Sequence, residues 1–195
     1  MPIRLILFST LMLFCAGSAM AQRPGPEFWR RVTCEPLEPR TKLEALEDRH
    51  STVIVKGFTR ITTVEVGGMR VDAVEMRELG NVSRAKGIVV TLREGGERPR
   101  ENRAFVDYEE IDPLLNAIDH LSRVDESTTK LAGFEAIYRT LGDLEINVFR
   151  QTRSGTAVIV TTGICEHARS TLSFDDLAKM KAMIQEAKQR LDELR

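Results

Sequence analysis

The sequence has 195 residues, with 28 basic and 29 acidic side chains, three cysteines and 42% hydrophobic residues. This length provides one compact domain or two small ones, with enough chain to bury a core. The composition excludes collagen-like, coiled-coil and wholly disordered proteins, and a formal net charge of -1 gives no overall attraction to nucleic acid or to an anionic membrane.

Residues 1–21 have the pattern of a secretory signal peptide. Arg4 precedes an apolar run, and small residues then lead to Ala19-Met20-Ala21, an A-x-A cleavage pattern. The apolar run is about a dozen residues long, short of the roughly 20 that a membrane-spanning helix needs. A lipoprotein anchor at Cys15 is the alternative, although Phe14 stands where a small residue is typical. We expect cleavage after this motif, and therefore a secreted or periplasmic protein without a membrane span.

The rest of the chain divides into a leader and two similar halves. Residues 22–50 form a Pro-rich leader with a short helix expected over residues 41–48. Residues 51–125 and 126–195 repeat one order of segments, namely three strands, a short strand and a helix. The sequence therefore predicts an α+β fold, a tandem pseudo-repeat of four antiparallel strands followed by a helix, packed as one compact unit.

Matching segments of the two halves support this repeat. Apolar residues alternate with polar ones along the expected strands, as in Leu144, Ile146 and Val148. Glycines such as Gly67 and Gly68 stand where tight turns are needed. In order, residues 61–66 align with 134–139, 71–77 with 144–150, 87–91 with 157–161, and 108–111 with 174–177.

Both expected helices carry an apolar stripe with three- and four-residue spacing. We interpret the stripes as core-facing, while the second stripe would also fit a dimer seam, so we expect a monomer or a weak dimer. The stripes are Ile111, Leu114, Leu115, Ile118 and Leu121 in the first helix and Leu177, Met180, Ile184, Ala187 and Leu191 in the second.

The starts of these helices have capping signals. Ser173 with Asp176, and Asp107 with Glu110, have the spacing of a capping box. Pro113 leaves two possibilities for the first helix. Either it lies inside a helix that begins after Asp107 and removes one hydrogen bond, or it is the first helical residue after a neighbouring aspartate cap.

The order of elements over residues 51–193 resembles that of the Whirly single-stranded-DNA-binding proteins. That resemblance implies single strands laid along a basic, aromatic sheet, whereas the expected strands here mix acidic and basic residues. With export expected as well, we expect no nucleic-acid partner.

A more specific resemblance links the chain to an uncharacterised family of secreted bacterial proteins. It is carried by KLEA at 42–45, FVDYEEID at 105–112, YRTLGDL at 138–144 and LSFDDL at 172–177. The resemblance covers most of the chain after the signal peptide. It implies the same fold and export, and it implies no particular activity.

Cys34 and Cys165 remain after signal cleavage. In an oxidising compartment such a pair predicts a disulfide that clamps the leader to the body, with a stabilisation of about 4–5 kcal/mol in the chain-entropy model. One alternative is a metal site that also includes His167, although the paired spacing of a structural zinc site is missing. Another is a catalytic thiol with His50, His120 or His167 as its base.

Basic residues gather in and before the segment 93–103, which we expect to be a long hairpin loop. Guanidinium and ammonium groups there could contact an anion or polyanion that carries phosphate or carboxylate groups. The alternative is a mobile loop with solvated charges. The possible anion contacts are Arg84, Lys86, Arg93, Arg98, Arg100 and Arg103.

Other patterns are weaker. The acidic cluster of Asp107, Glu109, Glu110 and Asp112 has the ligand type for calcium, but it lacks the EF-hand spacing and equally suits the start of a helix. Residues 81–83 form a glycosylation sequon. No nucleophile elbow, metalloprotease, Walker or dinucleotide-binding motif is present, so we expect no catalytic residues, metal or cofactor.

The sequence therefore favours an exported, non-catalytic binding or structural protein, whose partner is an unknown protein or a surface polymer. A small hydrolase that uses Cys165 or His167 is the alternative. A single-stranded nucleic-acid-binding module, by analogy of fold, is a second alternative.

Overall fold

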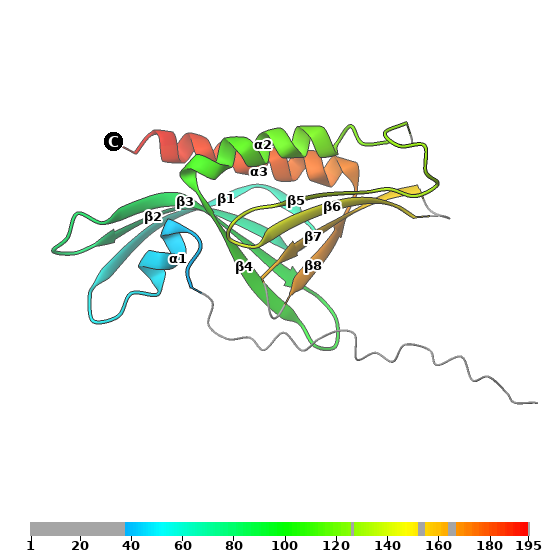
Figure 1. The fold of residues 1–195 in the computed structure, drawn as a ribbon. Helices are drawn as coiled ribbons and strands as arrows, with labels where there is room; N and C mark the ends of the chain where they lie inside the picture. The colour runs from blue at the N-terminus through cyan, green and yellow to red at the C-terminus, as the bar shows by residue number, and fades with distance from the viewer. Residues whose placement is uncertain (1–37, 126, 152–154, 164–166, 195) are drawn as a thin grey trace, which may run out of the picture. The chain divides into compact units, whose positions relative to one another are not determined.

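The chain folds into two antiparallel sheets with a helix after each (Figure 1). The computed structural model describes residues 38–125, 127–151, 155–163 and 167–194. The predicted signal peptide, most of the leader and both remaining cysteines lie outside these ranges. The described part confirms the predicted α+β fold, with four antiparallel strands followed by a helix, twice over.

The first sheet, here called sheet A, has the strand order β1-β2-β3-β4, and the second, sheet B, has the order β5-β6-β7-β8. Helix α1 lies in the leader and confirms the short helix predicted there. The bounds are α1 (Lys42–Glu47), β1 (Ile54–Val66), β2 (Met69–Glu78), β3 (Arg84–Glu94), β4 (Arg100–Asp107), α2 (Tyr108–Leu121), β5 (Glu135–Arg139), β6 (Leu144–Gln151), β7 (Gly155–Thr162), β8 (Ala168–Leu172) and α3 (Phe174–Asp192).

The prediction of a long loop over residues 93–103 is wrong. Arg93 lies opposite Glu101 and Glu94 lies opposite Arg100, so the strands β3 and β4 continue through most of this segment. Opposite charges at facing positions stabilise this end of the sheet. Because neither face carries apolar residues here, the segment has no alternating pattern that would predict a strand.

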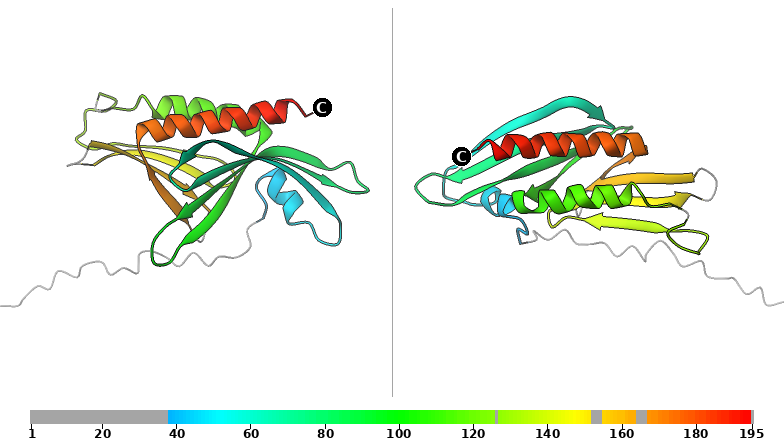
Figure 2. Two further views of the ribbon diagram at one scale, coloured as in Figure 1. Left: turned by 180° about the vertical axis from the view of Figure 1, so that it is seen from behind. Right: turned by 90° about the horizontal axis from the view of Figure 1, so that it is seen from above.

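Helices α2 and α3 lie side by side, and each contacts strands of both sheets. Helix α3, which follows sheet B in the chain, packs across β1, β2 and β3 of sheet A. Helix α2 runs beside α3 and contacts β3 and β4 of its own repeat and β5 of sheet B (Figure 2). The two repeats therefore share one core, and α3 covers the sheet of the opposite repeat.

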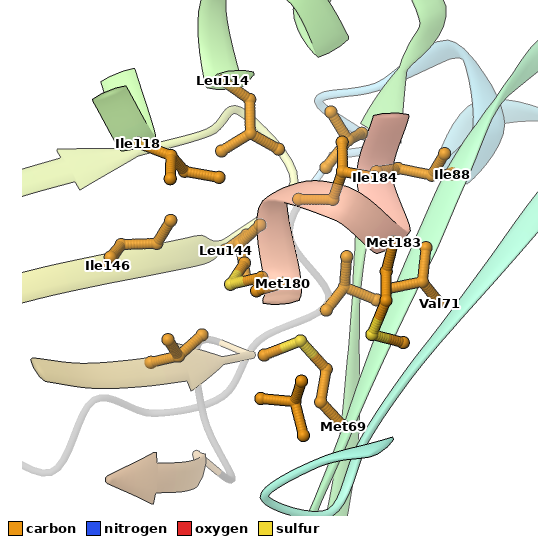
Figure 3. Packing of buried hydrophobic residues seen from close by; sticks show 14 of the residues in the cluster. Met69, Val71, Ile88, Leu114, Ile118, Leu144, Ile146, Met180, Met183 and Ile184 are labelled. Carbon is orange, nitrogen blue, oxygen red and sulfur yellow. The ribbon is translucent and has the colours of Figure 1, made fainter. Parts of the chain in front are cut away.

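This shared core contains side chains from both sheets and both helices. Figure 3 shows Met183 and Ile184 of α3 toward Val71 and Ile88 of sheet A, and Met180 toward Leu144 of sheet B. The apolar stripe of α3 is buried within the chain. Its interpretation as a core face is therefore confirmed, and the stripe is not open to serve as a dimer seam.

A second, smaller core lies on the opposite face of sheet A. There Leu43 and Leu46 of α1 pack against residues of β2, β3 and β4. These are Val74, Met76, Ala85, Val89 and Phe105. These strand residues alternate with those of the shared core, as expected when both faces of a sheet are buried. Sheet A is thus covered by α3 on its inner face and partly by α1 on its outer face (Figure 1).

The capping box predicted for Asp107 and Glu110 is wrong. Asp107 precedes α2 but makes no side-chain cap bond to it; its carboxylate instead accepts hydrogen bonds from the backbone N–H groups of Lys42 at 2.7 Å and Leu43 at 3.2 Å. Asp107 therefore caps α1 across 64 residues of sequence. A capping box cannot be distinguished by spacing alone from a carboxylate that serves another helix.

The other helix starts follow the sequence signals more closely. Ser173 and Asp176 form the predicted capping box of α3. Pro113 lies inside α2, which begins at Tyr108, so the first of the two possibilities for this proline holds. The helix tolerates the missing N–H near its start because its apolar stripe is packed into the shared core.

Replacing Asp107 with alanine is expected to loosen α1 and to lower the free energy of unfolding by about 0.5–2 kcal/mol, the usual range for loss of a helix cap. Urea unfolding measures the loss, and amide exchange locates it at residues 42–47. Glu97→Ala, in the exposed β3–β4 turn, is the control. An equal loss in both variants would contradict the capping role.

Candidate functional site

The outer face of sheet A, beyond the part that α1 covers, carries arginines from three strands. Arg60 of β1 lies opposite Asp72 of β2. In the neighbouring row, Arg70 of β2 lies opposite Thr91 of β3, which in turn faces Arg103 of β4. We call Arg60, Arg70 and Arg103 the arginine face.

Asp72 fixes two of these arginines. Its side chain is 11% exposed, and the carboxylate accepts from Nε of Arg60 at 3.3 Å and from Nε of Arg70 at 3.0 Å. Arg70 also donates from Nη2 to the Thr91 hydroxyl at 3.2 Å. Two cations share one carboxylate, so this group keeps a positive charge and further guanidinium N–H donors face solvent.

The third arginine belongs to a similar group. Arg103 contacts both carboxylate oxygens of Glu47, at 3.2 and 2.8 Å, and its guanidinium carbon lies 5.1 Å from the Phe105 ring centre. Lys56 pairs with the same carboxylate at 3.1 Å. Again one carboxylate serves two cations, so this second group also keeps a positive charge.

This arrangement suits a ligand with several negative groups. Guanidinium groups bind carboxylate and phosphate in a two-point geometry. Neighbouring strands lie about 4.8 Å apart, so arginines on β1, β2 and β4 span roughly 14 Å across the sheet. A single small anion does not bridge that distance, whereas a chain of anionic units does.

The six possible anion contacts from the sequence fall into two groups. Arg84 and Lys86 lie at the start of β3, while Arg93 lies near its end, about 24–31 Å away at the rise of a strand. Strand alternation places Arg93 on the outer face with Arg103. Arg98 lies in the turn and Arg100 begins β4, so the six do not form one site.

Sequence reasoning missed Arg60 and Arg70. Their strands mix acidic and basic residues, which suggested a balanced charge. The missing signal is the strand register, because only the pairing of Arg60 with Asp72 shows that this carboxylate is shared. Alternation along one strand gives the face of a residue, but not its cross-strand neighbour.

Arg84 and Lys86 contact other parts of the fold: Arg84 pairs with Glu75, and Lys86 contacts the end of α3. A groove of about 240 Å³ is lined there by these two residues, Lys42, Tyr108 and Glu109, among others. Lys86 donates to the carbonyl oxygen of Leu191 at 2.8 Å and lies 4.3 Å from the Tyr108 ring centre. It thereby satisfies the last turn of α3, where a cation is favourable.

The acidic cluster before and within α2 is divided among separate partners. Glu109 pairs with Lys42 at 2.5 Å, and this hydrogen bond lowers the pKa of Glu109 and raises the pKa of Lys42. Glu110 accepts from the Leu141 N–H at 2.9 Å, while burial raises its pKa. In the described ranges, no three His, Cys, Asp or Glu residues are placed to hold a metal ion.

The residues of the hydrolase and metal hypotheses lie elsewhere. Cys34 and Cys165 are outside the described residues, so those hypotheses and the disulfide remain predictions. His167 lines a groove of about 160 Å³ beside Arg139, Glu145 and Thr161. Its buried Nδ1 has no hydrogen-bond partner among the described residues. His50 and His120 are exposed.

The chain matches no protein-family model, no curated protein and no solved structure. Among the helices of the part described, none is long and apolar enough to cross a membrane.

Proposed function

We propose that the protein is an exported, non-catalytic binding protein that holds an acidic surface polymer on its arginine face. The observation that carries this proposal is the fixing of Arg60 and Arg70 by the buried carboxylate of Asp72. A preorganised cation loses less conformational entropy when it binds than a free one does. The predicted signal peptide supports export.

A polymer fits this face better than a small molecule does. The three arginines come from three strands, and their side chains are 40–52% exposed. Repeated weak contacts along a chain can add to a useful affinity through effective concentration. Polysaccharides with carboxylate groups and polymers with phosphate groups both have the required chemistry.

The test is binding of the purified protein to immobilised alginate, a polycarboxylate, and to polyphosphate. We expect the double variant Arg60→Gln/Arg70→Gln to bind roughly tenfold more weakly or worse, since charged hydrogen bonds contribute about 1.5–3 kcal/mol each. Added salt should weaken the binding of the wild type more steeply than that of the variant.

The matched control is Arg139→Gln/Arg169→Gln, which removes two exposed arginines from sheet B. An equal loss in the control would contradict a specific role for the arginine face. A single-stranded oligonucleotide is included as a third probe. Preference for that probe would favour the nucleic-acid alternative that the resemblance to Whirly proteins implies.

A further inference from the structure

Strand β1 forms one edge of sheet A, and within the described ranges it pairs only with β2. Its register with β2 is regular from Ile54 to Ile61 and becomes irregular between Ile61 and Val66. Along the regular half, alternate backbone N–H and C=O groups point away from β2. Such an edge is a template for another strand unless it is covered.

A groove adjoins this regular half. It has a volume of about 180 Å³ and lies between β1, β2 and the last turns of α3, with Gly57, Thr59, Leu191 and Leu194 among its lining residues. A Cβ atom at Gly57 would meet only the carbonyl oxygen of Glu75, at 4.0 Å. The missing side chain at this position therefore leaves the groove open.

Exposed apolar side chains flank the groove. Val55 is 47% exposed and Phe58 is 64% exposed, although both belong to a strand of an otherwise well-packed sheet. Because they are three positions apart on one strand, they point to opposite faces and present apolar surface on both sides of the edge. An added strand would bury part of each.

The charge of the edge selects its occupant. Between Ile54 and Ile61 the strand contains Lys56 and Arg60 and no acidic residue. A second copy of β1 paired antiparallel would bring like charges together across the new pair, which is destabilising. The acidic side chains nearest this half of the strand, Glu47, Asp72 and Glu75, each pair with two basic residues. Positive charge therefore remains in excess at Lys56 and Arg60, and an incoming strand with acidic side chains would meet it favourably.

We propose that the edge of β1 binds an extended segment of a partner protein with alternating apolar and acidic side chains. The segment adds to sheet A as a fifth strand, with an apolar side chain in the groove beside Gly57 and its acidic side chains toward Lys56 and Arg60. Main-chain hydrogen bonds supply affinity, and the groove and charges supply specificity. This site goes beyond the arginine face and shares only Arg60 with it.

The experiment selects peptides from a random 12-residue display library on the purified protein. The best peptide is then synthesised and titrated by fluorescence anisotropy and amide NMR. We expect alternating apolar and acidic residues in the selected peptides, and shifts centred on the amides of residues 54–61. A proline in the middle of the peptide, which removes a strand hydrogen bond, should abolish binding.

Gly57→Leu fills the groove and leaves the backbone edge in place, so we expect it to weaken peptide binding at least tenfold. Gly133→Leu is the matched control, because a Cβ at Gly133 meets nothing within 4 Å. Gly57→Leu should leave alginate binding unchanged, while Arg70→Gln should weaken alginate and spare the peptide. The two proposals can therefore fail separately.

Four results would overturn the edge proposal. These are a library without enriched peptides, amide shifts away from β1, equal binding by Gly57→Leu and the control, and a concentration-dependent dimer that forms through β1. The dimer would show that a second copy of the chain occupies the edge, in spite of the like charges.

Discussion

The fragment of residues 38–125, which contains α1, sheet A and α2, is expected to be unfolded when produced alone. In the whole protein, the inner face of sheet A is covered by α3 from the other repeat. Without α3, buried residues such as Val71, Ile88 and Val90 would face water. Exposure of a large apolar side chain costs about 1.5–3 kcal/mol, and several together exceed the usual 5–15 kcal/mol stability of a domain.

Circular dichroism and the amide dispersion of a proton–nitrogen NMR spectrum measure this outcome, with residues 38–195 as the folded control. The control should also unfold in one cooperative transition with urea. A fragment with dispersed amides, or two separate transitions in the control, would show that the repeats fold independently. Either result would contradict the shared core.

The packing of α3 on the sheet of the other repeat marks the limit of what the sequence predicts about the fold. Alternation and three- and four-residue spacing predict the strands, α2 and α3, because burial of one face imposes those periods. The two apolar stripes, however, look alike. Nothing local to Leu114 or Ile184 indicates which sheet each will cover, since that choice depends on the packing of the whole chain.

The candidate site shows the same limit at the level of single residues. Arg103 was among the possible anion contacts because it lies in a visibly basic segment, whereas Arg60 and Arg70 are separated in sequence from that segment. Asp72 joins them only after β1 and β2 have paired. Charge runs in a sequence thus indicate loops and strand ends better than they indicate shared carboxylates on a sheet.

Asp107 is a second example, because its carboxylate connects the leader to the first repeat, and its spacing from Glu110 does not reveal this. It caps α1 from the start of α2, and Arg40 beside α1 pairs with Asp143 in the β5–β6 turn. The start of the described chain is therefore tied to both sheets. Asp143, the partner of Arg40, lies near the chain segment that leads to Cys165 and is therefore relevant to the predicted disulfide.

Reduction of a disulfide between Cys34 and Cys165 is expected to lower the free energy of unfolding by about 4–5 kcal/mol in the chain-entropy model. The contacts on the described flanks support this pairing. Asp143, the partner of Arg40, also accepts a backbone hydrogen bond from Gly163 at 3.3 Å.

The sequence distances fit as well. Cys34 precedes Arg40 by six residues, and Cys165 follows Gly163 by two. Six residues reach about 20 Å when extended, which gives ample chain for the bond. The described contacts at Asp143 are therefore compatible with the predicted bond.

Intact mass with and without reductant, followed by urea unfolding of both forms, tests the prediction. Cys34→Ser/Cys165→Ser is the control, and its stability should equal that of the reduced wild type. If the bond only joined a loose leader to the body, its loss would leave the unfolding free energy of the sheets unchanged. Two thiols that react at once in the native, unreduced protein would contradict the disulfide, and would return Cys165 and His167 to the hydrolase hypothesis.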